Sequence, residues 1–289
     1  MLAAEINCVS TLIPHARFYN LLIYTAIYYY IMIKSYYKKA YCERIITMKA
    51  ALQLFSIKDI SEGKGIFEAL RIAKELGYEG VEFAGYFGKT PEELKSELDR
   101  LGLEVAGAHI HADGFADERI DETIKGLEIL GAYSTCIPWY TIETAEQAAS
   151  AGKLFDSIGK KVTAHGIKFG YHNHVKEYAE IDEKLIIDII LENSSPENLF
   201  YELDCRHAAI SNHNPIVEAI RYSGRIPVLH ARDTDMEKDV AVGCGVVDFP
   251  TVVKEANGVE WLVVENGNIG SNLEELRVSA EYLKEKFCK

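Results

Sequence analysis

Residues 226–233 read Ile-Pro-Val-Leu-His-Ala-Arg-Asp, and this stretch decides the fold. A short apolar run ends abruptly in imidazole and charged side chains. Such a run is typical of a strand in a parallel sheet, where both faces are buried and polar residues collect at the carboxyl end. The same pattern recurs on either side of this stretch, which predicts a repeated unit.

Seven further segments share this character. Together with 226–230, the expected strands are 50–56, 80–84, 104–110, 134–138, 168–172, 199–204 and 261–265. The stretches between them carry an apolar residue every three or four positions, as at Leu94, Leu98 and Leu101, which is the helical period. Thr90-Pro91-Glu92-Glu93 is typical of a helix N-cap with proline at the first helical position.

Eight strand–helix units without long hairpins predict an α/β fold, a (β/α)8 TIM barrel over residues 48–289. An open doubly wound sheet is the rival fold, but eight even units favour closure, and no GxGxxG loop follows the first strand. No proline- or serine-rich linker interrupts the series, so residues 48–289 are expected to form one catalytic domain.

Residues 1–47 have a different composition. Residues 18–33 form a 16-residue, mostly apolar run, shorter than the roughly 20 residues that span a bilayer. The run also lacks the small-residue cleavage pattern of a signal peptide. Two interpretations stay open: a hydrophobic extension that associates weakly with a membrane, or upstream sequence joined by a misassigned start. The second is favoured because a strand pattern begins directly after Met48.

The net charge of −13 argues against a nucleic-acid partner, because proteins that bind nucleic acid usually present a basic face. The six cysteines are scattered and include no CxxC pair. That usage is typical of reduced thiols, so a cytoplasmic protein without membrane contact is expected.

Imidazole and carboxylate side chains occur at the carboxyl ends of most expected strands, and these ends meet on one rim of a barrel. Such groups are ligands for Mn²⁺, Co²⁺, Zn²⁺ or Mg²⁺. A lone histidine there is usually structural, and a lone carboxylate is often a helix cap. Independent caps do not explain the whole set, so the rim is predicted to hold one divalent metal ion. The set comprises Glu82, His109, His172, His174, Glu177, Glu202, Asp204, His207, His230 and Glu265.

Several stretches, taken in order, carry a family resemblance. They include 77–85 (GYEGVEFAG), 170–174 (GYHNH), 202–204 (ELD), 226–233 and 242–249 (VGCGVVDF). The sequence resembles the sugar phosphate isomerase/epimerase family of xylose isomerase-like barrels, which includes inosose dehydratases. The resemblance covers nearly all of residues 48–289.

The resemblance implies a metal held by groups from strands five to eight. Asp204, His230 and Glu265 match the family's ligands on the last three of these strands. The strand-five ligand is usually a glutamate, and here His172 is the nearest match, with His174 and Glu177 as alternatives. Because of this departure, a mechanism with two glutamates does not follow from the resemblance.

The implied activity is that of an isomerase or epimerase, acting on a sugar, sugar phosphate or related keto-polyol through an enediolate. Glu265 is expected to bind the metal and carry a proton, with His174 or Glu177 as the second acid–base group. Arg232 can alternatively hold a phosphate or pair with Asp233, and Trp139 can stack on a sugar or pack on a loop. The expected substrate-binding residues are Glu82, His109, Trp139, His207 and Arg232.

Three alternatives stay open. An inosose-dehydratase-like lyase shares the same ligands, and a catalytically silent sugar-binding barrel fits the missing strand-five glutamate. The Asp204-x-x-His207 spacing also occurs in endonuclease-IV-like nucleases, although the acidic charge argues against DNA as substrate. The resemblance implies a small-molecule carbohydrate as partner, and a homo-oligomer stays open because barrels of this family often pair.

Overall fold

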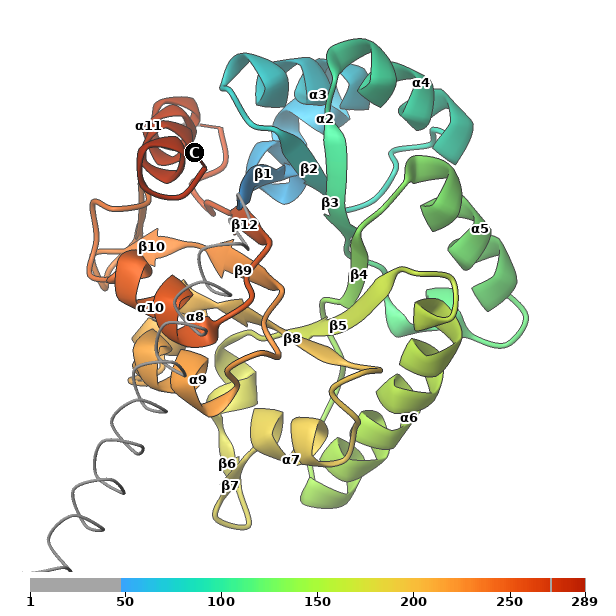
Figure 1. The fold of residues 1–289 in the computed structure, drawn as a ribbon, viewed down its shortest axis with the longest axis vertical. Coiled ribbons are helices and arrows are strands. Elements are labelled where there is room, and N and C mark those ends of the chain that lie inside the picture. The colour runs from blue at the N-terminus through green and yellow to red at the C-terminus, as the bar shows by residue number, and fades with distance from the viewer. Residues whose placement is uncertain (1–47, 271, 289) are drawn as a thin grey trace, which may run out of the picture. The chain divides into compact units, whose positions relative to one another are not determined.

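The computed structural model describes residues 48–270 and 272–288. At its centre is an eight-stranded parallel sheet with the order β3-β2-β1-β12-β9-β8-β5-β4. The outer strands β3 and β4 meet through single bridges, Val105 to Ala132 and His109 to Cys136, so the sheet forms a nearly closed barrel (Figure 1). The strands are β1 (Lys49–Gln53), β2 (Gly80–Phe83), β3 (Glu104–Ala108), β4 (Ser134–Ile137), β5 (Lys168–His172), β8 (Phe200–Asp204), β9 (Val228–Ala231) and β12 (Trp261–Val264).

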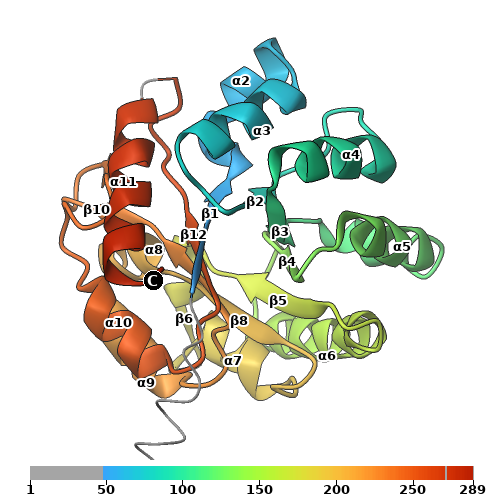
Figure 2. The ribbon, with the colours of Figure 1, turned by 45° about the horizontal axis from the view of Figure 1, so that its top comes forward.

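Helices follow the strands in turn and surround the barrel (Figure 2). The predicted (β/α)8 TIM barrel is therefore confirmed. The longer helices are α3 (Ile66–Glu75), α4 (Pro91–Leu101), α5 (Ile120–Leu130), α6 (Ala145–Thr163), α7 (Ile186–Glu192), α9 (Pro215–Arg221), α10 (Phe249–Ala256) and α11 (Leu273–Lys286). The shorter elements are α2 (Lys58–Gly63), α8 (Cys205–Ile210), η1 (Leu54–Ile57), η2 (Ala112–Phe115), η3 (Val175–Tyr178) and the hairpins of β6 (Glu180–Ile181) with β7 (Lys184–Leu185) and β10 (Asp233–Thr234) with β11 (Asp239–Val240).

The expected strands are found within a few residues of their predicted bounds. The first strand is the main exception, because it ends at Gln53 rather than at residue 56. The side-chain oxygen of Gln53 accepts a hydrogen bond from Phe55 N at 3.1 Å, and this bond turns the chain into η1. The capping box at Thr90 and Glu93 is confirmed at the start of α4.

The strands pack on two sides, because successive side chains on a strand point to opposite faces. One set contacts the surrounding helices in the main hydrophobic core. The other set forms a second apolar cluster, which we assign to the barrel interior. Its buried members are Ala51, Ala106, Cys136, Phe200, Val228, Trp261 and Val263.

Residues 47–289 cluster into one compact unit. The interpretations offered for residues 1–47 lie outside the described residues. Within the part of the chain that the structure describes, no helix combines the length and apolar character needed to cross a bilayer.

Candidate metal centre and cleft

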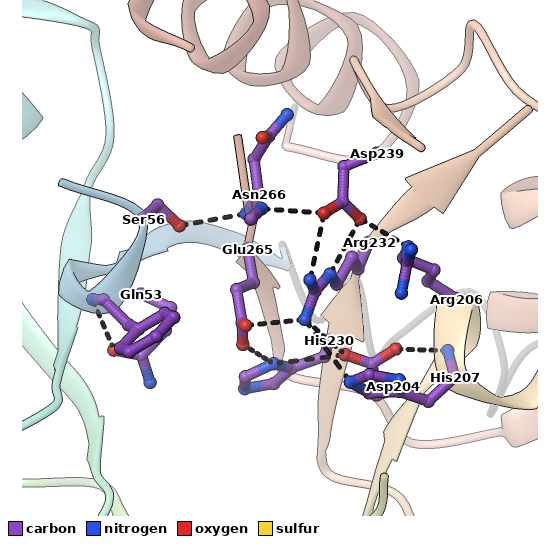
Figure 3. A network of polar contacts seen from close by, with 12 residues as sticks. Gln53, Ser56, Asp204, Arg206, His207, His230, Arg232, Asp239, Glu265 and Asn266 are labelled. Carbon is purple, nitrogen blue, oxygen red and sulfur yellow. Dashed lines mark hydrogen bonds and ion pairs between the residues drawn. The ribbon is translucent and has the colours of Figure 1, made fainter. Parts of the chain in front are cut away.

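Four neighbouring strands deliver the predicted ligands to one place. His172 ends β5, Asp204 ends β8, His230 lies within β9 and Glu265 directly follows β12. Each side chain can offer one ligand atom, and the four atoms lie within 4.8 Å of one another. The structure therefore brings together the whole predicted ligand set, of which Figure 3 shows Asp204, His230 and Glu265.

Two atoms of this set are buried without a hydrogen-bond partner among the described residues. They are Asp204 Oδ2 and His230 Nδ1, and neither makes a hydrogen bond. His230 Nδ1 lies 3.2 Å from Glu265 Oε2 and 4.0 Å from Asp204 Oδ2, outside hydrogen-bond geometry. Leaving such atoms unsatisfied costs about 1–3 kcal/mol each. Two imidazoles and two carboxylates suit Mn²⁺, Co²⁺ or Zn²⁺, so the donor set fits a divalent cation.

Two fully buried carboxylates orient the imidazoles from below. Glu202 Oε2 lies 3.0 Å from His172 Nδ1 and 2.7 Å from His109 Nε2. Glu82 Oε2 lies 2.8 Å from His230 Nε2. One ring nitrogen of each proposed histidine ligand is thus held by a carboxylate, which leaves the other nitrogen for a cation. This arrangement is typical of metal-binding histidines.

The protonation states in this layer differ from residue to residue. Burial raises the pKa of Glu82, and the neighbouring Glu202 raises it further. Burial acts on Glu202 in the same direction, but His230 and His109 outweigh it and hold the pKa of Glu202 well below its usual range. Burial, with His230 nearby, lowers the pKa of His172 well below its usual value. His172 is therefore neutral and can bind a cation through its free nitrogen.

Arg232 lies beside the cluster, and its guanidinium is paired with two carboxylates. Its Nε and Nη2 donate to the two oxygens of Asp239 at 2.9 and 3.0 Å, and Nη1 donates to Glu265 Oε1 at 2.7 Å (Figure 3). Burial disfavours the charged form of Glu265, but Arg232 and His230 outweigh it and hold the pKa of Glu265 well below its usual range. The expected pairing of Arg232 with Asp233 is wrong, because the Asp233 carboxylate accepts backbone N–H groups instead.

His174 and Glu177, the two candidates for the second acid–base group, lie in different environments. His174 lines the cleft above the cluster, and its Nδ1 has no partner among the described residues. Burial, with His207 nearby, lowers the pKa of His174 to about 3, so the ring is neutral at physiological pH. Glu177 is buried and accepts hydrogen bonds from Tyr171 OH at 2.6 Å and from His174 N at 2.8 Å. Glu177 therefore holds the backbone of His174 in place.

The cleft has a volume of about 490 Å³, within the range of small-molecule sites. Among the expected substrate-binding residues, His109 and Trp139 line it. Glu82 is fully buried beneath it, and His207 and Arg232 are buried beside the metal cluster. Gln53, Phe55 and His111 also line the cleft, although they are not among the expected site residues. The lining residues are Gln53, Phe55, Ala84, Gly85, His109, His111, Pro138, Trp139, His172, His174 and Glu265.

Sequence comparison places these features among known proteins. Residues 70–286 match a family described as xylose isomerase-like TIM barrels. An inosose dehydratase of Geobacillus kaustophilus (strain HTA426) is 24% identical over 204 residues, which cover 62% of this chain and 65% of that enzyme. The match thus spans slightly less than two thirds of the relative's length.

Solved structures share the fold. A sugar phosphate isomerase/epimerase from Parabacteroides distasonis ATCC 8503 superposes with a TM-score of 0.71 at 23% identity, covering 83% of this chain and 100% of the other. An L-ribulose 3-epimerase superposes with a TM-score of 0.62 at 14% identity, covering 83% and 94%. At these identities the likeness establishes the barrel architecture.

Proposed function

The chain belongs to the xylose isomerase-like TIM barrel family, and we propose that it is a divalent-metal-dependent isomerase or epimerase. Its substrate is a sugar, sugar phosphate or related keto-polyol. One observation carries the proposal: four potential ligands converge from adjacent strands, and two of their buried atoms have no hydrogen-bond partner among the described residues.

The proposed ligands of one ion are His172, Asp204, His230 and Glu265. When bound there, a divalent cation supplies Lewis-acid stabilisation of the negative charge that develops on a substrate oxygen. Arg232 donates to Glu265 Oε1 and keeps this carboxylate ionised, so that it can accept a proton. The neutral ring of His174 presents its unpartnered Nδ1 on the cleft side of the site.

The proton steps follow from these two groups. The carbon-bound proton next to the substrate carbonyl passes to Glu265, and the electron pair of the broken C–H bond moves towards the carbonyl oxygen. Return of the proton to the neighbouring carbon gives isomerisation. Delivery of a proton to the opposite face of the same carbon gives epimerisation, and His174 is the proposed carrier of that proton from water in the cleft to the substrate.

A dehydratase is the second candidate, and the similarity to an inosose dehydratase favours it. The first proton transfer is the same in both reactions. In dehydration the hydroxyl on the β-carbon then leaves with a proton as water, and His174 is the proposed carrier of that proton from water in the cleft. The two candidates differ only after the enediolate has formed, so the same ligands and the same first base serve both.

Two measurements test the proposal. The first is the metal content of the purified full-length chain, by inductively coupled plasma mass spectrometry, beside an Asp204→Ala/His230→Ala variant. About one Mn, Co or Zn per chain is expected, and it should be lost in the variant and kept in Glu104→Ala, where only a surface ion pair is removed. The second is deuterium incorporation from D₂O into a panel of ketoses and inososes, followed by NMR.

Absence of metal, with no uptake on titration with MnCl₂, would refute the proposed mechanism. Metal binding without deuterium incorporation across the panel would favour a catalytically silent sugar-binding barrel.

A further inference from the structure

We propose that the substrate of this site is an uncharged sugar or cyclic polyol ketone and not a phosphate ester. The inference rests on the proposed function and narrows its substrate class. Three independent features support it: the charged side chains near the cleft, the backbone N–H groups in the loops after the seventh and eighth barrel strands, and the aromatic side chains that line the cleft.

No described residue that lines the cleft is a lysine or an arginine. The guanidinium of Arg232, beside the metal cluster, already makes two hydrogen bonds to Asp239 and one to Glu265. A phosphate group needs a cation or several free donors to replace its water. Both guanidinium groups near the metal cluster are already paired with carboxylates, because Arg206 Nε also lies 2.7 Å from Asp239 Oδ1.

Backbone N–H groups after the seventh barrel strand are also occupied. In TIM barrels the loops after the last two strands frequently form a phosphate site. Here the carboxylate of Asp233 takes that position, because Oδ2 accepts from Gly243 N at 2.9 Å and from Gly245 N at 3.0 Å. Oδ1 accepts from Val247 N at 3.2 Å and from Thr234 N at 2.9 Å. The carboxylate of Asp233 thus occupies the backbone N–H groups that could otherwise bind a phosphate.

The loop after the eighth strand is arranged in the same way. Gly267 N donates to Asp239 Oδ2 at 2.8 Å. Asn266 N donates to Ser56 Oγ at 3.0 Å (Figure 3). Asn268 N donates to the side-chain oxygen of Asn266 at 2.8 Å. Three successive N–H groups are therefore committed to the protein, and a phosphate would have to displace their partners.

Two large aromatic side chains line the cleft and remain accessible. Phe55 is 40% exposed and Trp139 is 50% exposed. Lys58 Nζ lies 4.7 Å from the ring centre of Phe55, and Lys176 Nζ lies 3.1 Å from that of Trp139, but neither lysine lines the cleft. Lys176 also donates to Tyr140 O at 2.6 Å. Exposed ring faces beside polar groups suit the apolar face of a neutral sugar ring.

The test compares matched neutral and phosphorylated ligands on the full chain loaded with Mn²⁺. D-fructose with D-fructose 6-phosphate and D-ribulose with D-ribulose 5-phosphate are assayed for deuterium incorporation, and a neutral inosose is added. Binding of each compound and of inorganic phosphate is measured in parallel by isothermal titration calorimetry. A kcat/KM at least tenfold higher for the neutral members is expected, with no saturable binding of phosphate.

The two arms separate failure of this inference from failure of the proposed function. A preference for the phosphorylated members would overturn the inference and leave the proposed function intact. If no compound exchanges deuterium, the proposed function fails and the binding arm decides: binding of neutral compounds alone supports the inference. Binding of inorganic phosphate or of the esters, or of no compound at all, overturns it.

Variants locate the binding. Trp139→Ala and Phe55→Ala are expected to weaken binding of the neutral ligand at least fivefold, whereas Leu154→Ala, at an exposed position on α6, should leave it unchanged. Lys58→Met is expected to change neither neutral nor phosphorylated ligands. A loss of phosphate-ester binding in Lys58→Met would show that this lysine recognises phosphate and would overturn the inference.

Discussion

Replacing Glu202 with glutamine is expected to weaken metal binding while the barrel stays folded. Glu202 is fully buried, and its Oε2 lies 3.0 Å from His172 Nδ1 and 3.4 Å from His230 Nε2. It therefore contacts two of the four proposed ligands. Glutamine keeps the shape but removes the charge, and its amide can no longer accept hydrogen bonds from all the facing imidazoles.

The expected loss follows from this double contact. Removing a partner of one metal-binding histidine typically lowers affinity by about 10–100-fold, which corresponds to about 1.4–2.8 kcal/mol. Because Glu202 orients two histidines, its substitution should fall towards the upper end of that range. Glu82 is equally buried but lies close to only one proposed ligand, His230. Glu82→Gln should therefore fall towards the lower end.

The assay is isothermal titration of the metal-free chain with MnCl₂, with circular dichroism to establish that each variant is folded. Glu104→Gln is the control, because Glu104 pairs with Lys49 on the surface. Its affinity should equal that of the unmodified chain. A folded Glu202→Gln variant that binds Mn²⁺ within twofold of the unmodified chain would refute the orienting role, and so would a larger loss in Glu82→Gln than in Glu202→Gln.

Three further predictions concern the surroundings of the site. Asp239→Ala leaves Arg232 buried without its main partner and should lower the free energy of unfolding by about 3–5 kcal/mol in urea titrations, where a change below about 1 kcal/mol would contradict the reasoning. Burial lowers the pKa of Lys176 from 10.5, so an alkaline titration of a Trp261→Phe variant, followed by the fluorescence of the remaining Trp139, should have its midpoint below that value and should lose the transition when Lys176→Met is added. Thr90→Ala removes the cap of α4 and should cost about 1 kcal/mol of stability with unchanged Mn²⁺ affinity, whereas an altered affinity would show that the site depends on this helix.

The fold could be predicted because each strand is a short apolar run between helical patterns. All eight expected strands are found, and the family resemblance is confirmed. The end of a strand was less predictable where a side chain forms a hydrogen bond with the backbone in place of the neighbouring strand. Gln53 lies in an apolar context that continues through Leu54 and Phe55, yet its side chain bonds to Phe55 N and ends the strand. A local hydrogen bond of this kind has no counterpart in hydrophobic periodicity.

The site was predictable where its residues end strands and less so where tertiary contacts choose the partners. A pairing of Arg232 with its neighbour Asp233 was one of the alternatives from the sequence, but adjacent residues on an extended chain point to opposite sides. Its actual partner, Asp239, is seven positions away, at the start of β11, the second strand of a short hairpin. Sequence spacing gives no means of choosing Asp239 over the other carboxylates in these loops.

Strand alternation accounts for the depth of each group in the barrel. On β8, Phe200, Glu202 and Asp204 are separated by two positions each, so all three point to the same side. Phe200 belongs to the inner apolar cluster, Glu202 holds His172 and His109, and Asp204 presents a buried oxygen without a partner among the described residues. One strand thus supplies an apolar side chain of the barrel interior, an orienting carboxylate and a proposed metal ligand in three successive layers. Because these layers share a backbone, a shift of β8 by one residue would remove all three from the barrel interior together, which ties the register of the sheet directly to the geometry of the proposed metal site.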